Sequence, residues 1–149
     1  GETLSLAAAK ATIATMQKEP VIETIWNLGT HLLESTSKII EDLNLSDFFE
    51  VKGYPCRSLF NIKSQASEDL EIDPLIIKSF LQQVFIRNGI LWSGFHNLCY
   101  SHTKTDIDNV ISCYQEALKT FKNTMNNPNA IKDSIMGKPI QPVFRKTKY

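Results

Sequence analysis

Residues 48–63 read Phe-Phe-Glu-Val-Lys-Gly-Tyr-Pro-Cys-Arg-Ser-Leu-Phe-Asn-Ile-Lys, and this stretch decides the fold class. Apolar residues partly alternate with polar ones in Phe48–Lys52 and in Arg57–Lys63, which is the period of a β-strand. Gly53-Tyr54-Pro55 lies between the two runs and supplies turn residues. The stretch therefore predicts an antiparallel hairpin whose turn is three or four residues long.

Helical patterns precede and follow this hairpin. Leu4–Gln17 is rich in alanine, and its apolar surface extends almost all round, so this helix needs covering on more than one side. From Pro20 to Leu43, apolar residues recur at three- and four-residue steps and predict a long amphipathic helix. Asp73-Pro74 then marks the start of another helix, which Asn88-Gly89 ends.

The second half of the chain predicts short strands and one long helix. Ile90–Trp92 is expected to be a short β segment, and Asn97–Ser101 a second one. Thr105, followed by two acidic residues, is expected to begin the last helix, which ends at Asn126-Asn127-Pro128. The predicted fold is α+β, with helices packed on a small antiparallel sheet: one domain over residues 1–126 and an irregular C-terminal tail over residues 127–149.

Composition restricts the classes of partner. The 149 residues contain 16 Lys plus Arg and 16 Asp plus Glu, so no net charge attracts the chain to nucleic acid or to an anionic membrane. No apolar run approaches the length of a membrane span. Three widely separated cysteines, Cys56, Cys99 and Cys113, suit a reducing compartment. We therefore expect a cytoplasmic protein without nucleic-acid or membrane partners.

Three stretches, in this order of elements, resemble the C-terminal small domain of class III (fold type I) pyridoxal-phosphate-dependent aminotransferases. The resemblance is strongest to the glutamate-1-semialdehyde 2,1-aminomutase-like branch. Residues 1–9 resemble the family's Gly-x-x-Leu-Ser-Leu-Ala-Ala-Ala helix start, and residues 87–91 its Gly-Val-Tyr/Leu segment at the beginning of a strand. Residues 102–108 resemble its His-Thr-x-x-Asp-Ile-Asp start of the last helix.

The resemblance implies a parent enzyme that acts as a homodimer and transfers an amino group to or from a small carbonyl or amino substrate. Its large domain would bind pyridoxal 5'-phosphate, and its Schiff-base lysine would lie upstream of Gly1. This chain is therefore expected to contain no catalytic and no cofactor-binding residue, and to be inactive alone. The alternative is a free-standing, non-catalytic α+β protein-interaction module.

Three residues are candidates for contacts with substrate or with the large domain. Many relatives carry an arginine near the final strand that binds a substrate carboxylate, whereas residues 93–97 here contain none. His96 and Asn97 are instead expected to donate hydrogen bonds to a polar substrate or to the neighbouring domain. Arg57, beside the hairpin turn, either contacts the large domain or substrate or is an exposed edge charge that discourages strand pairing.

Other constellations are weaker. His96, Cys99 and His102 are close enough in sequence for a loop to bring them together around a metal ion. Cys99 could also form a nucleophilic pair with one of these histidines. His31 lies on another helix, so no metal site is expected, and His102 is better explained as a structural residue near the start of the last helix. The basic segment 138–148 suggests a nucleic-acid arm, against which the balanced overall charge argues.

Overall fold

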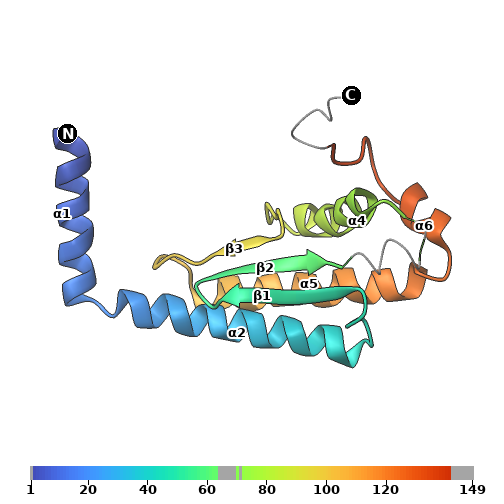
Figure 1. The fold of residues 1–149 in the computed structure, drawn as a ribbon, viewed down its shortest axis with the longest axis horizontal. Coiled ribbons are helices and arrows are strands. Elements are labelled where there is room, and N and C mark those ends of the chain that lie inside the picture. The colour runs from blue at the N-terminus through green and yellow to red at the C-terminus, as the bar shows by residue number, and fades with distance from the viewer. Residues whose placement is uncertain (1, 64–69, 71, 142–149) are drawn as a thin grey trace, which may run out of the picture.

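The computed structural model describes residues 2–63, 70 and 72–141, and it confirms the α+β class (Figure 1). Helices in this part of the chain are α1 (Thr3–Lys18), α2 (Val21–Asp42), α4 (Pro74–Arg87), α5 (Lys104–Thr124) and α6 (Pro128–Asp133). The strands are β1 (Phe49–Tyr54), β2 (Arg57–Ile62) and β3 (Phe95–Asn97). They form one antiparallel sheet in the order β1-β2-β3.

The predicted hairpin is present, and its turn is shorter than expected. β1 and β2 pair from Phe49 opposite Ile62 to Tyr54 opposite Arg57, so two residues, 55 and 56, remain in the turn. Gly53 continues the ladder at a φ of 115°, in a region that favours glycine. The expected turn residues 53 and 54 are therefore part of the strand.

The prediction of a strand at Ile90–Trp92 is wrong. The Ile90 N–H donates to the Phe85 carbonyl at 2.9 Å, because the chain is still closing the C-terminal turn of α4 through Gly89, which has a φ of 76°. The ladder with β2 begins only where the Phe60 N–H donates to the Gly94 carbonyl at 2.8 Å. The second predicted segment, from Asn97, is likewise shifted, since β3 ends at that residue.

The core lies between the sheet and the helices on one of its faces. Phe49 and Phe60 of the sheet contact Phe121 and Tyr114 of α5, with ring centroids 4.9 Å apart for Phe49–Phe121 and 5.0 Å apart for Phe60–Tyr114. α5 runs behind the sheet in Figure 1, and it also packs against α2 and α4. The opposite face of the sheet carries exposed and half-buried side chains.

Two helix starts follow the predicted chemistry, one with a shift. At α4, the Asp73 carboxylate accepts from the Leu75 N–H at 2.8 Å, as expected for an N-cap residue. At α5 the N-cap is Thr103 rather than the predicted Thr105, because Thr103 and Asp106 form a reciprocal capping box. Helix α5 therefore begins at Lys104.

The segment after α5 is more ordered than the irregular tail expected from residue 127. Asn127 caps the six-residue helix α6, and Ile131 is fully buried in the core. Sequence periodicity cannot reveal so short a helix, since it covers less than two turns. Residues 142–149, which include much of the basic segment, lie outside the described part of the chain.

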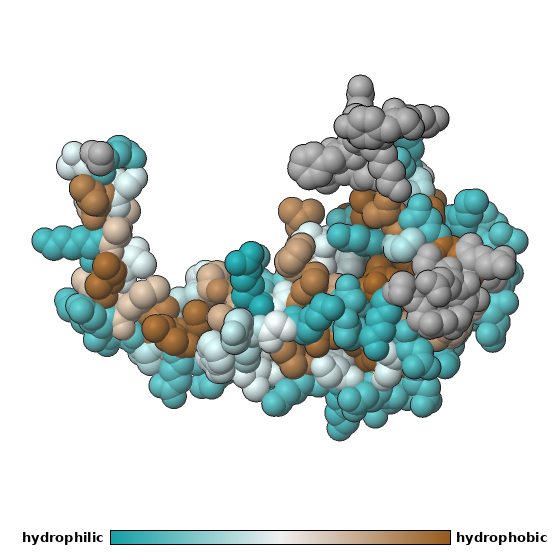
Figure 2. Space-filling view, in the orientation of Figure 1, coloured by the Kyte–Doolittle hydropathy of each residue, from teal (hydrophilic) through white to brown (hydrophobic). Residues whose placement is uncertain are grey.

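Helix α1 projects away from the rest of the molecule (Figure 1). None of its described side chains is buried; Leu6 is 65% exposed and Ile13 56% exposed. The space-filling view shows apolar side chains along this helix (Figure 2). In the described ranges, no helix combines the length and apolarity that crossing a membrane requires.

Candidate functional site

A row of polar side chains crosses the open face of the sheet. The register places Tyr54 of β1 opposite Arg57 of β2, and Arg57 opposite Asn97 of β3. Side chains directly opposite each other lie on the same face, with Cβ atoms about 4.5–5.5 Å apart. All three residues are exposed, Tyr54 at 72%. Arg57 and Asn97, two of the three predicted site residues, are therefore neighbours in one row.

The charges next to this row leave Arg57 available. On the same face, Glu50 accepts from Lys52 and from Asn61, each at 2.8 Å, and these hydrogen bonds lower the pKa of its carboxyl group. Lys52 is therefore paired with Glu50 of the same strand. Arg57, by contrast, forms no ion pair with any residue that the structure describes.

The row suits recognition of an anion. Arg57 offers the planar fork of donors that matches a carboxylate or a phosphate, and the Asn97 amide and the Tyr54 hydroxyl add donors on either side. The Tyr54 ring lies against Trp26 of α2, with ring centroids 6.3 Å apart. This contact links the row to the N-terminal half of α2.

His96, the third predicted residue, lies on the other face of the sheet. It is 7% exposed, and its Nδ1 is 2.8 Å from Ser58 Oγ while its Nε2 is 2.6 Å from the Tyr114 hydroxyl. Trp92 Nε1 donates to the same hydroxyl at 2.7 Å. The structure therefore does not place His96 in the row with Arg57 and Asn97, because successive residues of a strand point to opposite faces, although His96 and Asn97 both line one cavity.

Burial fixes the protonation state of this buried network. Desolvation lowers the pKa of His96 from 6.5 to about 4 and raises the pKa of Tyr114. A neutral His96 satisfies the chain of hydrogen bonds, since the Tyr114 hydroxyl donates to Nε2 and the Nδ1–H donates to Ser58. A charged His96 would leave the Tyr114 hydroxyl hydrogen without this acceptor.

A cavity of about 320 Å³ lies between β3 and the first turns of α5. Its polar lining includes His96, Asn97, His102 and Asp106, and its apolar lining includes Trp92. Asp106 is engaged in the capping box, whose hydrogen bonds from Thr103 lower its pKa. His96, His102 and Asp106 already form hydrogen bonds within the fold. The exposed row therefore remains the stronger candidate site.

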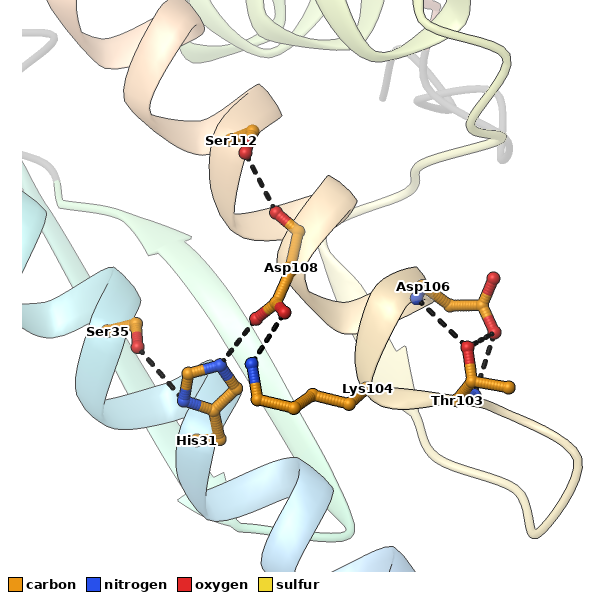
Figure 3. Close-up of polar contacts among 7 residues, drawn as sticks. All are labelled: His31, Ser35, Thr103, Lys104, Asp106, Asp108 and Ser112. Atoms are coloured by element: carbon orange, nitrogen blue, oxygen red, sulfur yellow. Dashed lines mark hydrogen bonds and ion pairs between the residues drawn. The ribbon is translucent and has the colours of Figure 1, made fainter.

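His31 has a partner that the sequence did not reveal. Its Nε2 lies 2.7 Å from Asp108 Oδ1 of α5, and Lys104 Nζ donates to the other carboxylate oxygen at 2.6 Å (Figure 3). Ser35 Oγ is 3.4 Å from His31 Nδ1, so a Ser-His-Asp order is present. The serine contact is long, and the His31 and Asp108 side chains are 40% and 44% exposed. The cluster therefore joins α2 to α5 rather than activating a nucleophile.

The residues weighed for metal or thiol chemistry do not converge. The Cys99 N–H donates to His102 Nδ1 at 3.1 Å, which agrees with the structural role predicted for His102. Cys99 Sγ is 3.2 Å from Ser101 Oγ, which lowers the thiol pKa, whereas His96 faces Tyr114. Among the residues with described positions, no three of His, Cys, Asp or Glu gather as a metal site would require.

Tyr54 and Gly29 are the residues that sequence reasoning missed. Tyr54 was assigned to the turn and so was not placed beside Arg57. Gly29 is buried in the middle of α2, where a Cβ atom would lie 1.9 Å from the Pro55 carbonyl oxygen. A glycine inside a long amphipathic helix was the available signal for this close approach.

Comparison with solved structures shows a shared fold. The PLP internal aldimine form of the FumI protein of Sphingopyxis sp. MTA144 matches 85% of this chain and 29% of its own, with a TM-score of 0.63 and 16% sequence identity. An omega-transaminase from Sphaerobacter thermophilus matches 64% of this chain and 23% of its own, with a TM-score of 0.51 and 13% identity. This chain thus spans less than a third of either protein.

Comparison of the sequence with protein-family models and with curated proteins found no match. At 16% and 13% identity, the two solved structures establish the fold of this chain. They do not establish what reaction or ligand its residues serve.

Proposed function

We propose that this chain is the C-terminal small domain of a PLP-dependent class III aminotransferase of the glutamate-1-semialdehyde aminomutase-like branch. The parent enzyme transfers an amino group to or from a small carbonyl substrate, or between neighbouring carbons of one substrate. It acts in the cytoplasm as a homodimer, and its large domain covers this one. The fold shared with the FumI protein and the omega-transaminase is the observation that supports the assignment to a PLP-dependent aminotransferase.

The family-like motifs support it because they coincide with element boundaries. Residues 2–9 contain the start and first half of α1, and residues 87–91 contain the end of α4 and the segment after it. Residues 102–108 contain the capping box and first turn of α5. Short motifs at three element boundaries of a shared fold are stronger support than the same motifs without a structure.

The cofactor does not fit this chain alone. Bound PLP acts as an electron sink, and its imine partner in the resting enzyme is a lysine activated by desolvation or by a neighbouring cation. Every lysine among the described residues is exposed or half-buried. We therefore propose that the Schiff-base lysine belongs to the large domain and that the isolated chain is inactive.

The exposed row is the part of this domain best placed to meet substrate or the large domain. Its donors face away from the core, and Arg57 has no anionic partner among the described residues. In the full-length enzyme, Arg57→Gln should raise KM for an anionic substrate or weaken the domain contact. Lys119→Gln, an exposed lysine on α5, is the matched control and should leave both unchanged.

A PLP titration of the purified chain tests the location of the chemistry. No saturable imine absorption band is expected, and borohydride reduction should fix PLP at no single lysine. A stable band that borohydride fixes at one lysine would overturn this part of the proposal.

Expression of the complete reading frame tests the function itself. The whole polypeptide should bind PLP at a lysine upstream of Gly1 and transfer amino groups from a panel of amine donors. A polypeptide that neither binds PLP nor transfers amino groups would contradict the proposal and favour a non-catalytic interaction module.

A further inference from the structure

The chain after α6 crosses the outer surface of α4 as a C-terminal strap, residues 134–140. Gln83 of α4 holds it with both ends of its amide, since Nε2 donates to the Ser134 carbonyl at 3.0 Å and Oε1 accepts from the Met136 N–H at 2.7 Å. Ser79 Oγ accepts from the Ile140 N–H at 2.9 Å. Because these bonds reach its backbone, the strap is fixed to α4 at both ends.

A cavity of about 330 Å³ lies between α4 and the strap. This volume is at the lower end of the range found for small-molecule sites. Its apolar lining is formed by Ile86, Ile135, Met136 and Ile140, and its polar lining by Ser79, Gln82, Gln83, Arg87 and Lys138. The cavity thus combines an aliphatic wall with two cationic side chains from separate segments of the chain.

The two cations have no anionic partner within the described structure. No described residue that lines the cavity is acidic, and neither Arg87 nor Lys138 forms an ion pair with a described residue. Arg87 Nη2 lies 3.2 Å from Met136 Sδ, and a thioether is a weak acceptor. Two like charges at one cavity repel each other, so a bound anion would stabilise the arrangement.

We propose that this cavity binds a small carboxylate with an apolar body. The Arg87 fork takes the carboxylate, Lys138 adds a second positive charge, and the aliphatic wall buries the hydrocarbon part. A phosphate group would use the same cations and would leave the aliphatic wall unfilled. The site is separate from the row across the sheet and does not depend on the parent enzyme's cofactor.

Titration of the complete 149-residue chain with hexanoate, followed by two-dimensional NMR, tests this proposal. Saturable shifts are expected for the amides of α4 around residues 83–87 and for those of the strap. Acetate, which lacks the apolar body, and hexan-1-ol, which lacks the charge, should each bind more weakly. Equal binding of hexan-1-ol, or shifts spread over the whole molecule, would overturn the proposal.

Three variants locate the site. Arg87→Gln and Lys138→Gln should each weaken hexanoate binding about tenfold, the effect of losing one charge-assisted hydrogen bond. Lys132→Gln removes an exposed lysine of neighbouring α6 that does not line the cavity, and it should bind hexanoate as the original chain does. All three substitutions replace exposed side chains, and circular dichroism checks that the fold is retained. Equal affinity in all three variants would contradict the assignment.

Discussion

At the scale of single residues, Gly29 permits α2 to approach the hairpin turn. A Cβ atom at this position would lie 1.9 Å from the Pro55 oxygen and 2.3 Å from its carbonyl carbon. Both are backbone atoms, so a change of rotamer cannot relieve the overlap. The helix must move away from the turn if any other residue replaces this glycine.

Gly29→Ala should therefore lower the free energy of unfolding. Alanine favours helix by about 1 kcal/mol over glycine, but the overlap with backbone should cost about 3 kcal/mol or more, so the clash decides the sign. Urea denaturation measures the difference, with Asn27→Ala on the exposed side of α2 as control. A Gly29→Ala variant as stable as the original chain would contradict this account of the helix–turn contact.

The buried, neutral ring of His96 should make the stability of the fold depend on pH. The unfolded chain binds a proton near pH 6.5, whereas the folded chain binds it only near pH 4. Between these values the unfolded state holds more protons, so stability rises with pH across this window. The loss on acidification from neutral pH to below 4 should be about 3 kcal/mol from this residue.

Denaturation at a series of pH values measures that loss, and His96→Gln should flatten the slope between pH 6.5 and 4. The NMR signals of the His96 ring follow its protonation directly. If the His96 ring titrated near its ordinary pKa of 6.5, the proposed cause of the acid sensitivity would be wrong.

At the scale of elements, the contact between α2 and α5 combines buried packing with one polar cluster at its surface. Lys104 and His31, in that order, lower the pKa of the Asp108 carboxyl group by hydrogen bonding to it. A depressed carboxyl pKa stabilises the fold above the unfolded value of 3.8, and this stabilisation is lost as pH falls through the folded value.

Asp108→Asn should therefore be less stable than the original chain at neutral pH, and the two should converge in acid. Because Asp108 is exposed to solvent, salt should reduce the difference as well. Thermal unfolding at low and high salt measures this, and Glu34→Gln on α2 is the control that removes a carboxylate without a recorded ion pair. A difference unaffected by both pH and salt would point to lost packing instead.

At the scale of the whole molecule, α1 is the part that the rest of the chain does not cover (Figures 1 and 2). At 16 residues, α1 is little longer than the length below which an isolated helix is marginal in water, so covering its apolar face would stabilise it. In the proposed parent enzyme, the large domain provides that cover. Without it, the apolar side chains of α1 form an exposed patch of the kind that drives association.

The isolated chain should therefore self-associate as its concentration rises. Replacing two exposed apolar residues of this helix, Leu6→Gln with Ile13→Gln, should shift the chain toward monomer, whereas Lys10→Gln should not. Sedimentation velocity measures the change, and an apolar dye reports the patch. A chain that stays monomeric at high concentration and binds no dye would disprove this prediction.

The local features of this protein could be predicted from its sequence. Asp73-Pro74, Asn88-Gly89 and the alternating stretch at 48–63 predicted a helix start, a helix end and a hairpin, because each depends on neighbouring residues. These were enough for the α+β class. The boundaries differ from the prediction where further pairing extended an element, as in the ladder at Gly53 and in the capping box at Thr103.

Which distant residues meet depends on how the elements pack in three dimensions. The sequence singled out Arg57, His96 and Asn97, yet the register of β2 with β3 placed Arg57 beside Asn97 and turned His96 into the core. In the same way, His31 met Asp108 across 77 residues. Periodicity shows that two side chains share a face of one element, but which elements pack together depends on the fit of whole surfaces.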